Sequence, residues 1–194
     1  MVGSGCADRT EQLCTIVRTR GLRRLEKPIQ LASGQWSRDF VDVKAALARG
    51  EDLGLACRAI LDALACREVS FDALGGPTMG ADHLAHGAAM LGDKEWFVVR
   101  KAPKGRGTGR QIEGASLGDR RQVVLLEDVV TTGGSIASAF ETIRQTGAVV
   151  TAALALVDRG ATATRYFEAR GVPYLALLTY QHLGIEPVDE GPAP

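Results

Sequence analysis

The uninterrupted apolar run from Val123 to Leu126 constrains the fold more than any other segment of the chain. A strand with one face in water alternates apolar and polar residues, whereas a strand inside a parallel sheet is apolar on both faces. The run therefore predicts a central strand of a parallel sheet. Glu127 and Asp128 follow it directly, at the carboxyl end of the strand, and open parallel sheets bind their ligands at that edge.

The segment TTGGS, residues 131–135, predicts an anion-binding turn that leads into a helix from Ile136. Its glycines let backbone N–H groups approach an anion, its hydroxyls add donors, and the helix N-terminus favours negative charge. The acids before it would repel a phosphate but accept hydrogen bonds from sugar hydroxyls, so the predicted ligand is a sugar phosphate. The spacings GxxxxGK[ST] and GxGxxG are absent, which argues against a nucleoside-triphosphate or dinucleotide site.

The apolar run, the two acids and TTGGS together resemble the phosphoribosyl pyrophosphate (PRPP) motif of the type I phosphoribosyltransferases. The resemblance implies that Glu127 and Asp128 bind the ribose 2′ and 3′ hydroxyls, and that TTGGS binds the 5′-phosphate. The residues it implicates in PRPP binding are Arg100, Lys101, Lys104, Arg106, Glu127, Asp128, Val129, Val130, Thr131, Thr132, Gly133, Gly134 and Ser135.

Residues 100–114 predict a mobile basic loop, because cations alternate there with glycines. By itself such a loop is equally typical of a solvated surface or a nucleic-acid contact. It also resembles the catalytic loop of orotate phosphoribosyltransferases, and the resemblance implies catalytic roles for Lys101, Lys104, Arg106 and, at the acidic pair, Asp128. Arg106 stands where a His is frequent, and its very high pKa puts a proton-donating role there in doubt. The family's loop, 101–115 here, reaches the neighbouring subunit's site, which implies a homodimer.

Residues 31–44 contain a turn signal at Ser33 and Gly34 followed by alternating residues, which predicts a hairpin-like strand pair. The segment resembles the part of orotate phosphoribosyltransferases whose aromatic residue stacks on the pyrimidine, and Phe40 matches that residue. Its alternative role is that of an ordinary core aromatic. The resemblance also implies that Arg159, at the end of another predicted strand, pairs with the orotate carboxylate; the alternative is a surface arginine. The implied orotate-binding residues are Phe40, Thr131 and Arg159.

Two further positions depart from the family pattern. Ala32 stands where many members carry a lysine, so the PRPP contact made by that lysine is missing here. Thr78, Met79 and Gly80 match a turn that approaches the pyrophosphate, and some relatives have a lysine where Gly80 stands.

Strands that alternate with helices predict an α/β fold. We expect one domain, residues 1–194, with a central parallel sheet of about five strands flanked by helices, as in the type I phosphoribosyltransferase fold. Expected helices cover residues 8–20, 51–67 and 161–170, and expected strands include 69–74, 96–99, 149–157 and 174–178. A small N-terminal hood, about residues 1–45, is implied by the resemblance.

Charge and cysteine content exclude several classes of protein. Lys plus Arg and Asp plus Glu both number 23, so no overall field favours nucleic acid or an anionic membrane as a partner. No secretory leader and no apolar run of about 18 residues occur, which predicts a cytoplasmic protein. The four cysteines form no CxxC pair and are expected to be buried reduced thiols. His83 and His86 share a helical face but lack the further ligands that zinc needs.

The sequence thus predicts an orotate phosphoribosyltransferase that transfers the phosphoribosyl group from PRPP to orotate, giving orotidine 5′-monophosphate and pyrophosphate in pyrimidine biosynthesis. The resemblance implies Mg²⁺ as cofactor, held mainly by PRPP with no dedicated protein ligand. Two alternatives remain open. One is another type I phosphoribosyltransferase acting on a purine or another base, and the other is a non-enzymatic PRPP-sensing regulator.

Overall fold

A six-stranded sheet lies at the centre of the computed structural model, which describes residues 3–31, 34, 36–102, 110–118 and 120–188. The strand order is β5-β4-β3-β6-β7-β8. The strands are β3 (Ala73–Pro77), β4 (Glu95–Val99), β5 (Ile112–Gly114), β6 (Gln122–Val130), β7 (Val149–Asp158) and β8 (Tyr174–Thr179). Five of them run parallel, as predicted, and β5 pairs antiparallel with β4 at the edge. β5 was missed because it has three residues and follows a glycine-rich basic segment.

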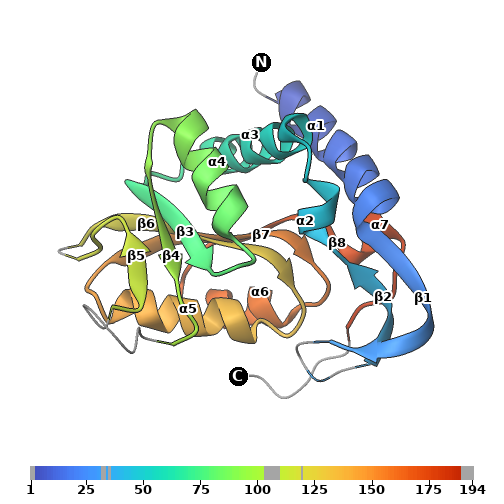
Figure 1. Ribbon diagram of the computed structural model, residues 1–194. Coiled ribbons are helices and arrows are strands. Elements are labelled where there is room, and N and C mark those ends of the chain that lie inside the picture. The colour runs from blue at the N-terminus through green and yellow to red at the C-terminus, as the bar shows by residue number, and fades with distance from the viewer. Residues whose placement is uncertain (1–2, 32–33, 35, 103–109, 119, 189–194) are drawn as a thin grey trace.

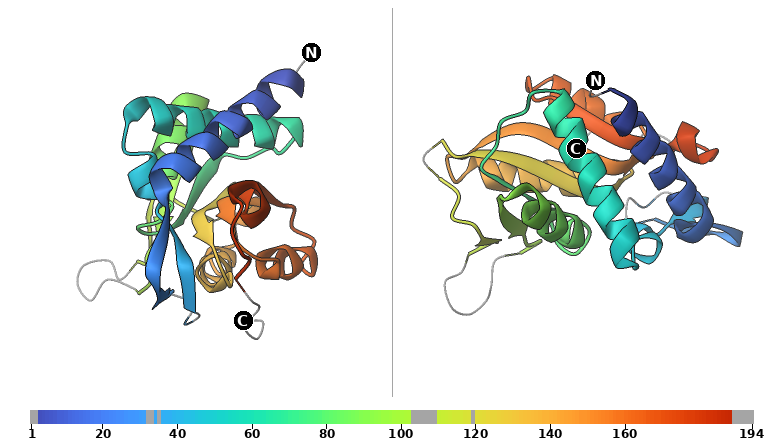
Figure 2. Two further views of the ribbon diagram at one scale, coloured as in Figure 1. Left: turned by 90° about the vertical axis from the view of Figure 1, so that its right-hand side faces the viewer. Right: turned by 90° about the horizontal axis from the view of Figure 1, so that it is seen from above.

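Helices cover both faces of the sheet, so the structure has three layers (Figures 1 and 2). One face carries α1 (Gly3–Ile16), α3 (Gly50–Cys66) and α4 (Asp82–Gly92), and the other carries α5 (Gly134–Arg144) and α6 (Thr162–Glu168). Short elements complete the chain: the π-helical turn η1 (Val17–Gly21), α2 (Val43–Ala46) and α7 (Tyr180–Leu183). The predicted helices 51–67 and 161–170 correspond to α3 and α6, whereas α1 begins well before residue 8.

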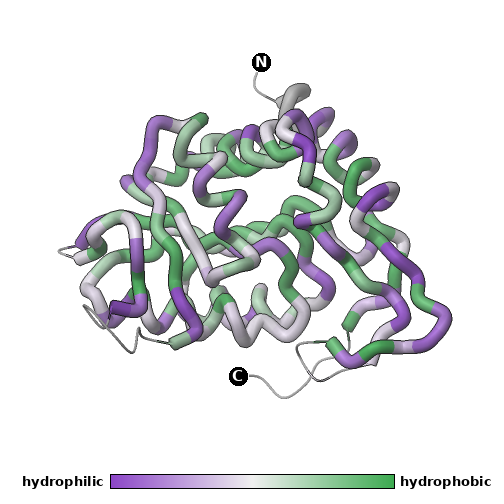
Figure 3. The backbone as a smooth tube through the Cα atoms, in the orientation of Figure 1, coloured by the Kyte–Doolittle hydropathy of each residue, from purple (hydrophilic) through white to green (hydrophobic). Residues whose placement is uncertain are grey.

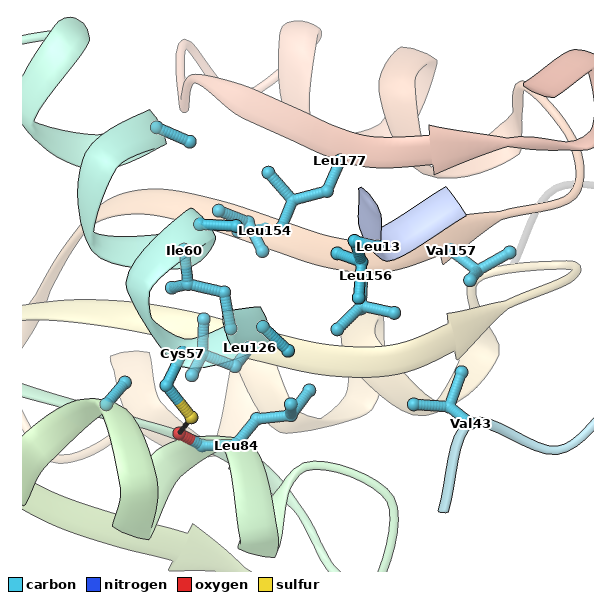
Figure 4. Close-up of a cluster of buried hydrophobic side chains, with 14 of the residues drawn as sticks. Leu13, Val43, Cys57, Ile60, Leu84, Leu126, Leu154, Leu156, Val157 and Leu177 are labelled. Carbon is cyan, nitrogen blue, oxygen red and sulfur yellow. Dashed lines mark hydrogen bonds between the residues drawn. The ribbon is translucent and has the colours of Figure 1, made fainter. Parts of the chain in front are cut away.

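The central strand β6 is buried on both faces, which confirms the interpretation of its apolar run. Val124 and Leu126 belong to the hydrophobic cluster beneath α1, α3 and α4, and Val123 and Leu125 belong to the cluster beneath α5 and α6. All four are fully buried. Figure 3 shows hydrophobic residues concentrated along the central strands, and Figure 4 shows Leu126 packed among side chains of the first cluster.

β3 corrects the prediction of a strand over residues 69–74. The strand runs from Ala73 to Pro77 and includes the two glycines that were expected to end it. A Cβ on Gly75 would lie 1.9 Å from the Phe97 carbonyl oxygen, and one on Gly76 would lie 1.8 Å from the Leu126 carbonyl oxygen. The glycines are therefore inside the strand because its backbone packs too closely for side chains.

A separate antiparallel hairpin, called here the hood hairpin, projects beside the sheet and consists of β1 (Leu22–Gln30) and β2 (Trp36–Val41) (Figures 1 and 2). The prediction of a strand pair within residues 31–44 was right for β2 and wrong for its partner, which precedes Leu31. β1 carries few apolar residues because most of it is exposed, so it gave no alternating signal. Ser33 of the turn signal lies outside the described residues. Beyond β2 the chain forms α2, whose Ala45 N–H donates to the Asp42 side chain (3.0 Å).

The burial of the cysteine side chains agrees only partly with the prediction. Cys57 is buried, and its thiol donates to the Leu84 carbonyl oxygen at 3.8 Å (Figure 4). Cys14 is half-buried and Cys66 is exposed, so the prediction of buried thiols was wrong for these two. Cys57 is a packing residue between α3 and α4, and burial raises the pKa of its thiol to about 11. Within the described part of the chain, no helix combines the length and apolarity needed to cross a membrane.

Candidate functional site

Glu127 and Asp128 lie in the last part of β6, at the carboxyl edge of the sheet. The strand continues to Val130, so the acids are part of it instead of following it. Glu127 is 5% exposed and Asp128 is 9% exposed. The Glu127 carboxylate accepts from the Asp128 N–H (3.3 Å), and Asp128 Oδ1 accepts from the Val129 N–H (2.8 Å). Both carboxylates are thus held in place by the backbone of their own strand.

Gly80 lies close to both acids. A Cβ on Gly80 would lie 2.5 Å from Asp128 Oδ1 and 2.8 Å from Glu127 Oε1. The two carboxylates therefore converge on the space that a side chain at position 80 would fill. The sequence indicated Gly80 as part of a turn near the pyrophosphate and as a departure from a lysine, and the structure places it beside the two acids.

Burial raises the pKa of Glu127 well above its usual range, and the neighbouring Asp128 carboxylate raises it further. Two carboxylates in one partly desolvated site repel each other, so their ionisation needs nearby positive charge. Lys44 supplies such a charge: its ammonium contacts Asp128 Oδ2 at 3.0 Å and lowers the pKa of Glu127. Lys44 was not predicted as a site residue, because its position in the short α2 gives no recognisable pattern.

The TTGGS turn connects β6 to α5 as predicted, and α5 begins at Gly134. Gly133 has φ +80°, the left-handed conformation that glycine adopts at little cost. The turn lines a cavity of about 380 Å³, called here the TTGGS cavity. Its lining includes Glu127, Val129, Val130, Thr131, Thr132, Gly133, Gly134 and Ser135. Exposed donors at a helix N-terminus next to buried acids give one cavity complementary to both a phosphate and sugar hydroxyls.

Arg100 and Lys101 line the same cavity, together with Gln111, which the sequence did not indicate. Arg100 Nη1 is 3.1 Å from Glu113 Oε1, and Gln111 Nε2 donates to the Arg100 carbonyl oxygen (2.9 Å). The β4–β5 pairing therefore fixes the base of the basic loop at the cavity. Lys104 and Arg106 lie outside the described residues, as does Gly105 between them.

Arg159 is almost completely buried, at 1% exposed, which excludes the alternative of a surface arginine. Its Nη1 donates to the Asp39 carbonyl oxygen (2.9 Å) and its Nη2 to Ser37 Oγ (3.1 Å). Its Nε is buried without a hydrogen-bond partner. Burial lowers the pKa of this guanidinium, and the Asp39 carboxylate opposes the effect. Arg159 therefore joins the end of β7 to the hood hairpin.

Phe40 follows Asp39 in β2 and is 36% exposed, so it is not the core aromatic of the alternative reading. It lies opposite Arg23 in the hairpin. Thr131 is a neighbour of the strand end that carries Arg159, because a Cβ on Gly160 would lie 3.2 Å from the Thr131 carbonyl oxygen. Arg159 thus contacts β2 at the residue before Phe40, and the strand end that carries Arg159 lies beside Thr131 of the TTGGS turn.

His86 packs edge-on against Trp96, with ring centroids 4.3 Å apart. His83 lies near Asp128 and Lys44, and burial lowers its pKa. No group of three or more His, Cys, Asp or Glu side chains in the described ranges is arranged to hold a metal ion.

Comparison with models of protein families gives no match. Known proteins, however, are similar over most of the chain. The orotate phosphoribosyltransferase of Streptomyces avermitilis is 40% identical over 164 residues, which cover 81% of this chain and 88% of the relative. The enzyme of the same name from Aquifex aeolicus is 36% identical over 179 residues, covering 89% and 96% of the two chains.

Solved structures agree with these relatives. The orotate phosphoribosyltransferase of Mycobacterium tuberculosis, crystallised in complex with PRPP, superposes with a TM-score of 0.74 at 27% identity. The match covers 91% of this chain and 99% of that chain.

Proposed function

The chain belongs to the orotate phosphoribosyltransferase family, and on that premise we propose that it transfers the 5-phosphoribosyl group from PRPP to orotate. The products are orotidine 5′-monophosphate and pyrophosphate, in pyrimidine biosynthesis. One observation carries the proposal: a single cavity is lined by the TTGGS turn, the buried Glu127 and the cations Arg100 and Lys101. This combination matches the phosphate, the ribose hydroxyls and the pyrophosphate of one ligand.

The reaction is a substitution at the anomeric carbon. A pyrimidine nitrogen of orotate forms the new bond as the carbon–oxygen bond to pyrophosphate breaks, so positive charge develops on the ribose and negative charge on the leaving group. Glu127 and Asp128 orient the ribose through its hydroxyls, and the TTGGS turn fixes its 5′-phosphate. Lys101, Lys104 and Arg106 stabilise the departing pyrophosphate electrostatically. No side chain forms a covalent bond.

Mg²⁺ is the proposed cofactor, held mainly by PRPP oxygens and not by a dedicated protein site. Such an ion fits the site because PRPP would bring its own oxygens, the hard ligands that Mg²⁺ prefers, into a cavity lined by polar groups. When bound, the ion neutralises charge on the pyrophosphate. Omission of Mg²⁺ from the assay is expected to abolish turnover, and its re-addition to restore it.

Phe40 and Arg159 are the proposed base-specificity residues, with Thr131. The aromatic face of Phe40 would stack on the pyrimidine, and the guanidinium of Arg159 would pair with the orotate carboxylate. In the free protein Arg159 binds the hood hairpin through both Nη atoms, and its unpartnered Nε leaves one further donor. Loading of orotate is therefore proposed to use that donor or to exchange a hood contact for the carboxylate.

We further propose a homodimer in which the loop 101–115 of one subunit completes the site of the other. The loop carries the leaving-group cations, and its base lies at the TTGGS cavity. Exposed apolar side chains such as Met90 (78%) and Trp96 (41%) offer surface that a partner subunit could cover. A cytoplasmic location stays a prediction from the sequence.

The test is a PRPP-dependent pyrophosphate-release assay with orotate, hypoxanthine, uracil and nicotinate as acceptors. Of these four acceptors, only orotate is expected to give turnover. Turnover with a purine but not with orotate would assign the chain to another type I activity. PRPP binding without turnover of any base would instead favour the PRPP-sensing regulator.

A further inference from the structure

We propose that Lys44 is a positioning residue for the ribose-binding acids, and that it couples the hood hairpin to the PRPP site. The proposal rests on the function proposed above and assigns to α2 a role in it. Its basis is a contact between two segments far apart in the sequence. The Lys44 ammonium, at the start of α2, lies 3.0 Å from Asp128 Oδ2, at the end of β6.

α2 is anchored so that Lys44 is directed to the acids. Two small apolar residues of α2 are buried in the core cluster beneath α1, α3 and α4. Val43, just before Lys44, is 0% exposed, and Ala46, two residues after it, is 1% exposed. The helix is capped by Asp42, whose carboxylate accepts from the Ala45 N–H (3.0 Å). β2 ends immediately before this cap, so the hood hairpin is joined directly to the helix that carries Lys44.

Asp128 is held from two sides. Its Oδ1 accepts from the Val129 N–H (2.8 Å), and its Oδ2 accepts from Lys44 (3.0 Å). An ionised carboxylate has about four acceptor positions, so these two contacts fix its orientation and leave lone pairs for hydroxyl donors. Lys44 is therefore compatible with a bound ribose and need not be displaced by it.

The positive charge of Lys44 has a second effect, on the ionisation of Glu127. The groups that act on it are Asp128, Asp42 and Glu127, and His83 of α4 lies in the same field. Burial lowers the pKa of the Lys44 ammonium, but the Asp128, Asp42 and Glu127 carboxylates together outweigh burial and raise it, so Lys44 stays charged near neutral pH. The positive charge in turn lowers the pKa of Glu127 and favours the ionised form of that acid.

The neighbouring turn does not supply this cation in place of α2. Gly80 lies beside both carboxylates, where a Cβ would be 2.5 Å from Asp128 Oδ1, but a glycine has no side chain that could bring a charge there. The positive charge at the acids therefore comes from the base of the hood hairpin. In this arrangement the geometry of the PRPP site depends on whether the hood hairpin keeps its contacts with Arg159.

The experiment compares Lys44→Met, which keeps the length of the side chain and removes its charge, with Lys44→Arg. Lys27→Met is the matched control, because Lys27 is an exposed lysine on β1 of the same hairpin. Calorimetric binding of PRPP, which needs no turnover, is measured beside KM values, pH profiles and thermal unfolding. If the wild-type protein turns over no base, the proposed function fails, and the calorimetry still decides the role of Lys44.

Lys44→Met is expected to weaken PRPP binding about tenfold, as for loss of a contact to a charged group. The KM for orotate should change much less. The acid limb of kcat/KM for PRPP should move to higher pH, because Glu127 loses the charge that lowers its pKa. Lys44→Arg should restore most of the binding, and Lys27→Met should behave as wild type. Wild-type PRPP affinity and an unshifted pH profile in Lys44→Met would overturn the proposal, as would equal effects in Lys27→Met.

Discussion

Arg159 donates to the main-chain oxygen of Asp39 across a distance of 2.9 Å, and so ties the end of β7 to the hood hairpin. The acceptor is a backbone atom, which makes the contact independent of the side chain at position 39. Ser37 Oγ accepts from the second terminal nitrogen of Arg159 (3.1 Å). A buried guanidinium held by neutral acceptors is stable only where its hydrogen bonds are made. Arg159 therefore holds the hood hairpin in place and also belongs to the proposed orotate site.

Replacement of Arg159 by Met should destabilise the protein by about 2–4 kcal/mol, because two hydrogen bonds from a buried charged group are lost. Urea unfolding measures this loss. Ser37→Ala is the matched control, since it removes one acceptor and keeps the guanidinium, and about 1 kcal/mol is expected. If Arg159 also binds orotate, its replacement raises the KM for orotate more than the KM for PRPP. A parallel rise in both constants would show a purely structural role.

Asp128→Asn should lower kcat/KM for PRPP by at least ~100-fold while leaving the melting temperature nearly unchanged. The amide keeps the shape of the side chain but weakens the acceptor for the ribose hydroxyls. The lost ion pair with Lys44 contributes little to stability because the lysine side chain is 54% exposed. Glu11→Gln, an exposed acid on α1, serves as control. A drop in melting temperature that matches the loss of turnover would contradict the assignment.

The two glycines of the TTGGS turn should respond differently to alanine. Gly133 has φ +80°, so Gly133→Ala is expected to cost about 1–2 kcal/mol of unfolding free energy and to raise the KM for PRPP. A Cβ on Gly134 meets no atom within 4 Å, so Gly134→Ala should leave the unfolding free energy within about 0.5 kcal/mol of wild type. Denaturant titration of both variants checks the difference, and equal destabilisation would be at odds with the conformation of the turn.

The raised pKa of Glu127 predicts opposite pH dependences for stability and for PRPP binding. Because burial favours the protonated acid in the folded protein, its contribution to stability is present at low pH. That contribution is lost as pH rises from the usual glutamate range through the raised pKa. The ribose contact needs the ionised acid, so PRPP affinity should rise over the same window.

Glu127→Gln separates this effect from other titrating groups. The variant should flatten the pH dependence of stability in that window and weaken PRPP binding at high pH. Thermal melts and calorimetry at matched pH values supply both curves. Stability and affinity that rise together in the wild-type protein would count against the assignment to Glu127.

Mixing of two inactive variants tests the shared site. In a random mixture of Lys101→Ala and Asp128→Asn subunits, mixed dimers have one site with an intact loop and an intact acid if the loop acts across the interface. About a quarter of the wild-type activity should then return. Each variant mixed with itself is the control. No recovery would place Lys101 in the site of its own subunit, whose cavity it lines.

The sequence predicted the sheet and the centre of the site because both depend on local patterns. The apolar run before Glu127 could be satisfied only by a strand buried on both faces, and TTGGS carries its chemistry in its own residue types. β3 was misplaced because Gly75 and Gly76 resemble a break, and only the packing of neighbouring backbones shows why they belong inside a strand.

Contacts between residues far apart in the chain could not be predicted from the sequence. Nothing near Lys44 indicates Asp128, and the partners of Arg159 lie in a hairpin whose first strand has no apolar alternation. Such contacts depend on where two segments meet after folding, so no local period encodes them. The roles of Phe40 and of the basic loop stay predictions, and Lys104 and Arg106 lie outside the residues that the structure describes.

Val99 and Ile112 face each other across β4 and β5, so the basic segment between them leaves and rejoins the sheet at neighbouring points. A tether of about a dozen residues that must return to its origin extends at most about 20 Å from it. The reach of its cations is thus set by chain length as well as by composition. Insertions or deletions there would change the length of the basic segment while both anchoring points stay where they are.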